Sequence, residues 1–337
     1  MRHMRVVQGP TAMKLAQRRR IGPVDLDLQT PMLVPSYSSK GFPDLQSVVD
    51  VTSDVVDGPA LFSAYDVHYK FVEPPFTFPS ICFLDSGGYE ASKDHELSDV
   101  GDKDHHPQKW ERSLHEAVVQ NWEASPASPT VIISYDHPRE RHLVADQIAL
   151  AKKGAELRTD LLQEILLKPE TKDQVLVQIA SVLASINELR NFDVIGLTEK
   201  ELGTSTLDRM VSIARLRRAM QSVGIETPIH IFGSLDTIST LLYFVAGADI
   251  FDGLTWLRYA YVDGYTIYKQ NYGNLHLPVT TRTPMIDAHC WFKNHSYLRD
   301  MELEMQRFAS TGDFDAFKHH SAIIKNAHEN MLSRLGD

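Results

Sequence analysis

Three aspartates stand at the ends of short apolar runs in this chain: Asp85, Asp136 and Asp252. In a parallel barrel, side chains at the carboxyl ends of the strands share one mouth. Carboxylates that share a site raise one another's pKa, which suits acid/base and nucleophilic roles. A single aspartate after a strand more often caps a helix or makes a turn. Three at separate strand ends favour a catalytic site, although some clustering is expected because strand ends precede loops.

Further candidates lie at or just beyond the ends of the apolar runs. Tyr89 follows Asp85 by four residues, and Arg258 follows Asp252 by six. Aromatic rings can stack on a planar ligand, and a guanidinium can pair with a carboxylate or a phosphate. Core packing is an equally good interpretation of the two rings, Tyr89 and Phe232. The remaining strand-end candidates are Gln178, Gly196, Leu197, Glu201 and Gly233.

Eight short runs rich in Val, Ile, Leu and Phe are the elements that must position these residues. Most of them do not alternate apolar with polar residues, as expected for parallel strands covered on both faces. The runs are Pro31–Ser36, Pro59–Ala64, Ser80–Asp85, Thr130–Asp136, Gln174–Ala180, Asp193–Leu197, Pro228–Gly233 and Ala248–Asp252.

Four longer stretches between the runs are predicted helices, because they are amphipathic or rich in helix-forming residues. Asp236 could start the last of them, and Gly224 and Gly247 stand where helices would stop. Residues 264–278 are expected to be extended chain or a hairpin, and residues 297–335 to be helical. The four stretches are Gln108–Glu123, His142–Leu167, Ser205–Val223 and Leu235–Ala246.

Eight strand-then-helix units predict a (β/α)₈ TIM barrel. A doubly wound open sheet is the alternative from pattern alone. A dinucleotide-binding version of it is disfavoured, because no glycine-rich phosphate loop follows the first strand. We predict a barrel domain over residues 1–282. A helical appendage packed on the barrel, with zinc binding as one option, is predicted over residues 283–337.

The composition excludes several classes of protein. Of 337 residues, 43% are hydrophobic and 23% charged, which disfavours a disordered chain. No apolar run approaches the length of a membrane span, and the first ten residues lack the apolar segment of a secretory signal. Cys82 and Cys290 are far apart in the sequence, which favours a reducing cytoplasm over a disulfide framework.

The net charge of −10 argues mildly against a nucleic-acid partner, although local patches can differ from the total. Two clusters of arginines could form such patches. Each is more simply interpreted as a solvated face. The clusters are Arg18, Arg19 and Arg20, and Arg215, Arg217 and Arg218.

Several segments together resemble the tRNA-guanine transglycosylase family. Phe83–Glu90 (FLDSGGYE) is similar to the family's DSGG(F/Y)Q motif, and Ile231–Arg258 to its spaced VxxGxDxFDxxxPTR stretch. Val175–Ile179 resembles its GxVQG strand, and Gly196–Glu201 its GGLxxGE turn. Ile21–Ser36 is similar to its opening strand, so the likeness covers nearly the whole chain in order. The combination is far more specific than DSGGY alone.

The resemblance implies that Asp252 attacks C1′ of the target nucleotide while Asp85 acts as the acid and base. Two successive displacements would retain the anomeric configuration. Tyr89 and Phe232 would sandwich the flipped base. The other implied contacts are Asp136 and Gln178 on the Watson–Crick edge, the Gly196 N–H on the base carbonyl, Leu197 and Gly233 beside the base, and Arg258 and Glu201 toward the nucleic acid.

The sequence departs from the family pattern at two places near these residues. The glutamine after DSGG(F/Y) is Glu90 here, and a carboxylate only accepts where an amide also donates. The proline and threonine before the family's arginine are replaced by Trp256 and Leu257. Base and sugar contacts are therefore expected to differ at these points.

The family's zinc site, C-x-C-x-x-C with a later histidine, is altered in this chain. Tyr297 matches the tyrosine seven residues after the family's third cysteine, which places Cys290 on that cysteine and Met285 and Asp287 on the other two. Since zinc accepts Cys, His and carboxylate ligands, a remodelled structural zinc site is one interpretation. Loss of the site, with surface histidines, is the other. The candidate ligands are Cys290, Asp287, His289, His295, His319 and His320.

Short family members with an altered metal region resemble the DpdA group, which places a 7-deazaguanine such as preQ0 into DNA. The resemblance therefore implies a pentosyltransferase acting on DNA, with helper proteins that open the duplex. The alternatives are a tRNA-guanine transglycosylase, its non-catalytic partner subunit, and a non-enzymatic barrel that binds a nucleobase; a homodimer also stays open. Having both Asp85 and Asp252 disfavours the partner subunit.

Overall fold

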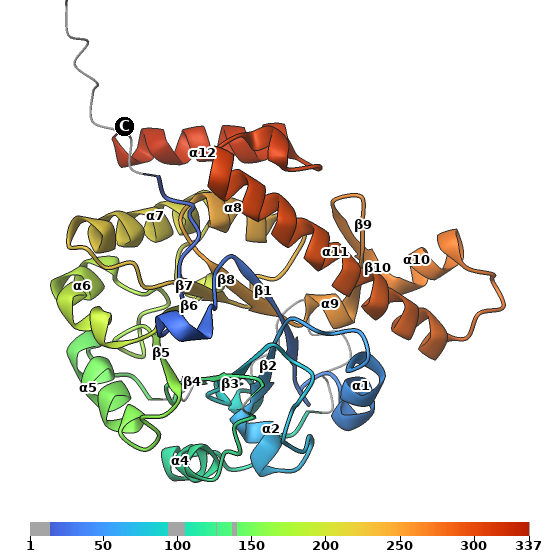
Figure 1. Cartoon of the computed structure of the whole chain (residues 1–337), viewed down its shortest axis with the longest axis horizontal. Helices are drawn as coiled ribbons and strands as arrows, with labels where there is room; N and C mark the ends of the chain where they lie inside the picture. Colours follow the sequence, from blue (N-terminus) through green and yellow to red (C-terminus); the bar gives the residue numbers. More distant parts are fainter. Residues whose placement is uncertain (1–13, 94–104, 126, 137–139, 337) are drawn as a thin grey trace, which may run out of the picture.

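The structure, a computed structural model, describes residues 14–93, 105–125, 127–136 and 140–336. Eight parallel strands close into a barrel in sequence order, β1 through β8, and β1 pairs with β8 to complete the ring (Figure 1). This architecture confirms the predicted (β/α)₈ TIM barrel. The strands are β1 Met32–Tyr37, β2 Pro59–Ser63, β3 Ile81–Asp85, β4 Thr130–Ile133, β5 Leu162–Leu167, β6 Val194–Thr198, β7 Ile229–Phe232 and β8 Ile250–Gly253.

Helices surround the barrel strands, as Figure 1 shows. The α-helices are α1 Leu45–Thr52, α2 Ala64–His68, α3 Gly88–Ala91, α4 Arg112–Gln120, α5 Val144–Ala155, α6 Ile179–Ala184, α7 Thr206–Ser222, α8 Ser239–Val245, α9 Thr255–Arg258, α10 Lys269–His276, α11 Thr283–Thr311 and α12 Ser321–Leu335. Short 3₁₀ turns lie at Val24–Leu26, Ile186–Asn191, Glu199–Glu201 and Phe314–Ala316.

The strands alternate between two buried surfaces. Phe83, Val131 and Ile250 belong to one apolar cluster, and their strand neighbours Leu84 and Phe251 belong to a larger cluster shared with the helices. Successive strand residues point to opposite faces, so the first cluster fills the barrel and the second joins it to the helices. A residue two positions after an inward one also points inward. This parity decides which side chains reach the mouth.

Local signals in the sequence begin two of the outer helices. The Ser205 hydroxyl accepts the N–H of Asp208 and caps α7. Asp236 accepts the N–H groups of Ile238 and Ser239 just before α8, at 2.7 and 2.6 Å. The serine and aspartate thus satisfy donors that a helix start leaves without partners.

The predicted strand five is wrong. The sequence favours a single helix over His142–Leu167, whereas the structure has α5 followed by β5, which pairs with β4 and β6. Arg158 fixes the turn between them by binding Asp160 at 2.8 Å and the Trp122 carbonyl at 2.7 Å. No proline stands between α5 and β5, so the helix-forming composition predicts one helix that continues to residue 167. The run Gln174–Ala180 contains no strand and leads into α6.

The segment after β8 folds onto the side of the barrel. Strands β9 Tyr259–Val262 and β10 Tyr265–Tyr268 form an antiparallel hairpin. Extended chain is wrong for most of the rest of residues 264–278, which form α10. Helix α11 starts at residue 283 and packs against β9, α9 and β1, while α12 lies along α7 and α8 (Figure 1).

A buried ion cluster ties the N-terminal end of β8 to two distant segments. Arg19 donates to Asp249 at 2.7 Å, and Arg217 pairs with the other Asp249 oxygen. All three residues are buried. These arginines come from the two basic clusters of the sequence. A solvated face is wrong for Arg19 and Arg217, whereas Arg18, Arg20 and Arg215 are exposed.

Among the residues that the structure describes, no helix combines the length and apolarity needed to cross a bilayer. Cys82 and Cys290 are both free and buried.

Candidate active site

A cavity of about 280 Å³ opens at the carboxyl ends of the barrel strands. Its walls come from seven of the eight barrel strands, from Asp136 just after β4, and from the chain after β8. The structure brings most of the predicted site residues together here. The predicted residues that line the cavity are Asp85, Tyr89, Asp136, Glu201, Phe232, Gly233, Asp252 and Arg258.

Asp252 is held by donors on both carboxylate oxygens. The Ser36 hydroxyl donates to Oδ2 at 2.8 Å, and the Gly233 N–H donates to Oδ1 at 3.0 Å. His230 Nε2 lies 3.3 Å from the same Oδ1. Hydrogen bonds to an ionised carboxylate favour that form. Asp252 is therefore fixed in orientation where it lines the cavity.

Asp85 lies in an environment that favours its protonated form. Burial, with the nearby charges of Glu90 and Asp252, raises the pKa of Asp85 to about 8, and the N–H groups of Ser86 and Gly87 only partly oppose this. The side chain is therefore mostly protonated at neutral pH. One cavity thus contains a carboxyl group held by hydrogen-bond donors and a second one that is mostly protonated, a combination suited to a nucleophile and a general acid.

Glu90, which replaces the family's glutamine, is buried behind Asp85. Ser38 and Ser63 both donate hydroxyl groups to it, the latter at 2.8 Å. Asp66 lies beyond it, and burial followed by the charge of Glu90 raises the pKa of Asp66 well above its usual value. Two serine hydroxyls thus give Glu90 the donors that a carboxylate needs, and its charge helps to keep Asp85 protonated.

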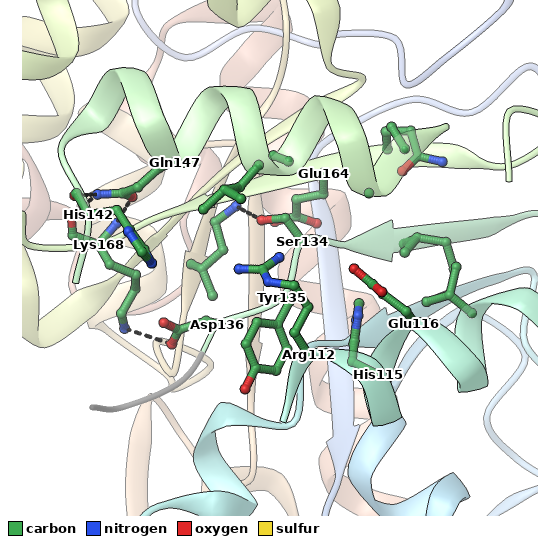
Figure 2. A pocket seen from close by; sticks show the side chains of 18 of the residues that line it. Arg112, His115, Glu116, Ser134, Tyr135, Asp136, His142, Gln147, Glu164 and Lys168 are labelled. Carbon is green, nitrogen blue, oxygen red and sulfur yellow. Dashed lines mark hydrogen bonds and ion pairs between the residues drawn. The ribbon is translucent and has the colours of Figure 1, made fainter. Parts of the chain in front are cut away.

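Asp136, Lys168 and Glu201 form a charged group on another wall of the cavity. Lys168 Nζ lies 2.8 Å from Glu201 and 3.6 Å from Asp136, and Figure 2 shows it facing Asp136. It also donates to Thr198 at 3.0 Å. Burial lowers the pKa of Lys168, but the two carboxylates outweigh this and raise it above its usual value. The group therefore offers one donor and two acceptors.

Two aromatic rings in the cavity are each held by a cation. Lys40 Nζ lies 4.2 Å from the centre of the Tyr89 ring, and Arg258 donates to the Tyr89 hydroxyl at 3.0 Å. The Phe232 ring stacks on His230 with centroids 4.0 Å apart. Cations over aromatic faces are stabilising. Both rings are therefore fixed surfaces and not loosely placed side chains.

Three predicted base contacts lie elsewhere. Gln178 is exposed at the start of α6, so its place at the end of strand five is wrong; Lys168 occupies that place. Leu197 is buried in the cluster shared with the helices, because its parity on β6 points outward. Gly196 points inward below the cavity, and a Cβ there would lie 2.6 Å from both Glu164 and Phe232.

Four functional candidates were missed from the sequence. Ser36, Lys168, His230 and Glu164 all follow the inward parity of their strands. For Ser36 and His230 the inward parity could be read from the sequence. Ser36 stands two residues after the inward Val34, and His230 stands two residues before Phe232. For the other two, the misplaced strand five hid the signal.

The predicted zinc ligands do not meet. Asp287 pairs with Lys269 at 2.7 Å, His289 contacts the Tyr272 hydroxyl at 3.1 Å, and His320 contacts the Gly264 carbonyl at 2.9 Å. Cys290 is buried in a small apolar cluster, His295 lies 3.9 Å from Asp57, and His319 lines a groove along α11. Within the described ranges, no three His, Cys, Asp or Glu side chains form a metal site. The arrangement does not fit zinc, which stays a prediction from the resemblance alone.

A smaller cavity of about 60 Å³ lies next to the main one, between β4, α4 and α5 (Figure 2). Arg112 stands over the Tyr135 ring at 4.7 Å. Burial, helped by the charge of Arg112, lowers the pKa of His115 to about 4, so its imidazole is neutral. Asp136 and Lys168 line both cavities. The small cavity is thus a lateral extension of the main site.

The fold and the site together define a TIM-barrel protein in which two carboxyl groups in different environments, Asp85 and Asp252, face one cavity. Comparison of the chain with protein-family models and with curated proteins finds no match.

Proposed function

We propose that this protein exchanges a guanine in DNA for a 7-deazaguanine base such as preQ0, through a covalent glycosyl ester on Asp252. The observation that carries the proposal is that two carboxyl groups in different environments line one cavity: Asp252 accepts hydrogen bonds on both oxygens, and burial raises the pKa of Asp85 to about 8. Retaining glycoside hydrolysis uses the same pairing of a carboxylate nucleophile with a carboxylic acid. The cavity of about 280 Å³ and its two fixed rings suit a planar base drawn out of the stack.

The first step forms a bond between an Asp252 oxygen and C1′ as the C1′–N9 bond breaks. The bonding pair leaves with guanine, and Asp85 supplies the proton that makes guanine neutral. In the second step the Asp85 carboxylate takes the N9 proton of the incoming base. N9 then bonds to C1′, and Asp252 leaves as a carboxylate. Both catalytic groups return to their starting states, so no other reactant is needed.

The charged group on the cavity wall supports a guanine-like base. The Watson–Crick edge of guanine presents one acceptor, O6, and two adjacent donors, N1–H and N2–H₂. Lys168 can donate to O6, while Asp136 and Glu201 can accept from the donors. Adenine and cytosine place an amino donor where guanine has O6, so each would bring a donor to Lys168. The group therefore favours guanine and its 7-deaza analogues.

Cations at the mouth support a polyanionic substrate in spite of the net charge of −10. Phosphate contacts usually come from arginine and lysine, and they position a nucleic acid without reading its sequence. Flipping one nucleotide into the cavity would leave its flanking phosphates near this rim. The cations that line the cavity and are at least partly exposed, apart from Lys168, are Arg141, Lys200 and Arg258, whereas Lys40 is buried against Tyr89. The free, buried cysteines suit the reducing cytoplasm in which such a substrate would be met.

The test is incubation of the protein with radiolabelled guanine or preQ0 and with plasmid DNA, single-stranded DNA or tRNA in parallel. The proposal predicts label in DNA and none in tRNA. Single-stranded DNA removes the need for helper proteins that open the duplex. Label in tRNA alone would replace DNA by tRNA as the substrate. No label in any of the three would overturn base exchange and favour a binding role.

A further inference from the structure

A chain of three side chains crosses the barrel interior beneath the cavity. Glu164 Oε1 lies 2.9 Å from His230 Nδ1, and His230 Nε2 lies 3.3 Å from Asp252 Oδ1. Glu164 and His230 are fully buried in the barrel, Glu164 on β5 and His230 on β7. We propose that Glu164 and His230 are positioning residues that fix Asp252 and set the charge of the site. This role rests on the proposed function, in which Asp252 is the nucleophile.

The surroundings of His230 leave it no other charged contact among the described residues. Glu164 from β5 and Asp252 from β8 are the charged groups that face it. On its other sides lie the Phe83 ring from β3, at 5.6 Å between centroids, and the stacked Phe232 ring. Burial lowers the pKa of His230, but the two carboxylates outweigh this and raise it to about 9. The ring is therefore an imidazolium at neutral pH. Its Nδ1 is hydrogen-bonded to Glu164, and its Nε2 lies within ion-pair distance of Asp252.

The second carboxylate matters for the charge on the nucleophile. An imidazolium paired with Asp252 alone would form a neutral pair and weaken the carboxylate as a nucleophile. Burial raises the pKa of Glu164, while the charge and hydrogen bond of His230 oppose this. With Glu164 ionised and sharing the imidazolium, the three groups together keep a charge of −1 beside the cavity. That charge also acts on Asp85, whose pKa the Asp252 carboxylate helps to raise. Glu164 thus favours both the ionised nucleophile and the protonated acid, although it touches neither reacting atom.

Gly196 makes room for this arrangement. A side chain there would meet Glu164 Oε1 and the Phe232 ring, each 2.6 Å from the Cβ position. The ring of Phe232 in turn covers one face of His230. The aromatic wall of the cavity and the buried ion chain therefore pack as one unit.

The decisive variant is Glu164→Gln, which keeps the shape and removes the charge. Histidine ring NMR across pH 5–10, with His230 assigned from its loss in His230→Gln, should find the His230 midpoint near pH 9 in the unaltered protein. The midpoint should fall in Glu164→Gln. In exchange assays kcat should fall roughly 10- to 100-fold and the alkaline limb of the rate should move to lower pH, with KM for the base little changed.

Glu304→Gln is the matched control, because Glu304 is also buried but lies on α11, outside the cavity. It should leave the His230 midpoint and the rate profile unchanged. A His230 midpoint at or below 6.5 in the unaltered protein, or one that Glu164→Gln does not move, would overturn the inference. An unaltered protein that exchanges no base would count against the proposed function, whereas the NMR midpoint decides the charge of His230 in either case.

Discussion

At the scale of single residues, the environment gives two identical side chains different chemistry. Asp252 accepts hydrogen bonds from Ser36 and Gly233 and faces an imidazolium, all of which favour its ionised form. Asp85 is buried near two other carboxylates, which favours its neutral form. Pairs of carboxyl groups separated in this way are typical of acid-assisted glycosyl transfer. The assignment of nucleophile and acid therefore follows from the neighbours of each group.

Asp252→Ala should lower base exchange by at least about 10³-fold, because no other carboxylate can bond to C1′ from the same position. The variant should keep its fold, because the substitution also removes the free-energy cost of burying a charged group. Label incorporation measures the first effect and the melting temperature the second. Asp160→Ala, at a surface ion pair with Arg158, is the control and should keep full exchange. Undiminished exchange by Asp252→Ala would remove Asp252 from the mechanism.

The pH dependence should follow Asp85. With its pKa raised to about 8, Asp85 is protonated below that pH and can deliver a proton to the leaving guanine. Above it the acid is lost, and kcat/KM should fall about tenfold per pH unit. The same raised pKa means that stability contributed by the neutral form declines as pH rises through 8. A rate that climbs steadily to pH 9 would contradict this role.

At the scale of the elements, strand parity explains why the site residues converge. Phe83 and Ile250 fill the barrel, so Asp85 and Asp252, each two residues further on, point into its mouth. Much of this was open to prediction from the sequence, because the runs before both aspartates are clear. Strand five was not, since a helix-rich composition masks the turn held by Arg158. Lys168 and Glu164 lay in the part of the chain assigned to the wrong element.

Gly196→Ala should test the packing of one such element. The added methyl group would overlap Glu164 and Phe232, and overpacking of this kind costs about 1–3 kcal/mol of unfolding free energy. Exchange should fall as well, because both neighbours belong to the site. Urea unfolding measures the first effect.

Gly154→Ala gives the matched comparison. Gly154 lies in α5 with open space around its Cβ position, so alanine there should raise stability by about 0.5–1 kcal/mol. Equal effects of the two substitutions would contradict the packing argument for Gly196.

At the scale of the whole molecule, the two ends of the barrel divide function from stability. The carboxyl end holds the cavity, and the amino end holds the buried cluster of Arg19, Arg217 and Asp249. This is the usual division of labour in TIM barrels. The cluster joins the segment before β1 to α7 and β8, three parts of the chain that are far apart in sequence. It therefore stabilises the closed barrel by holding these three segments together.

Asp249→Asn should lower the unfolding free energy by about 3–5 kcal/mol, because it leaves two buried guanidinium groups without their shared carboxylate. Glu226→Gln is the comparison, since Glu226 binds Arg19 from the solvent side with its side chain 63% exposed. That change should stay within about 0.5 kcal/mol. Chemical unfolding of both variants measures the difference. Similar losses of unfolding free energy would contradict a stabilising role for the buried cluster.

The sequence by itself determined the barrel class and seven of its eight strands, including the ends that carry Asp85 and Asp252, because buried parallel strands and their end residues are local patterns. Only the tertiary structure decided which segment forms strand five, that Arg19 and Arg217 are buried, and that the predicted zinc ligands stay apart. It also decided that a histidine lies between two carboxylates. These outcomes depend on contacts between residues distant in the chain, and the charge state of a buried group depends on such contacts alone.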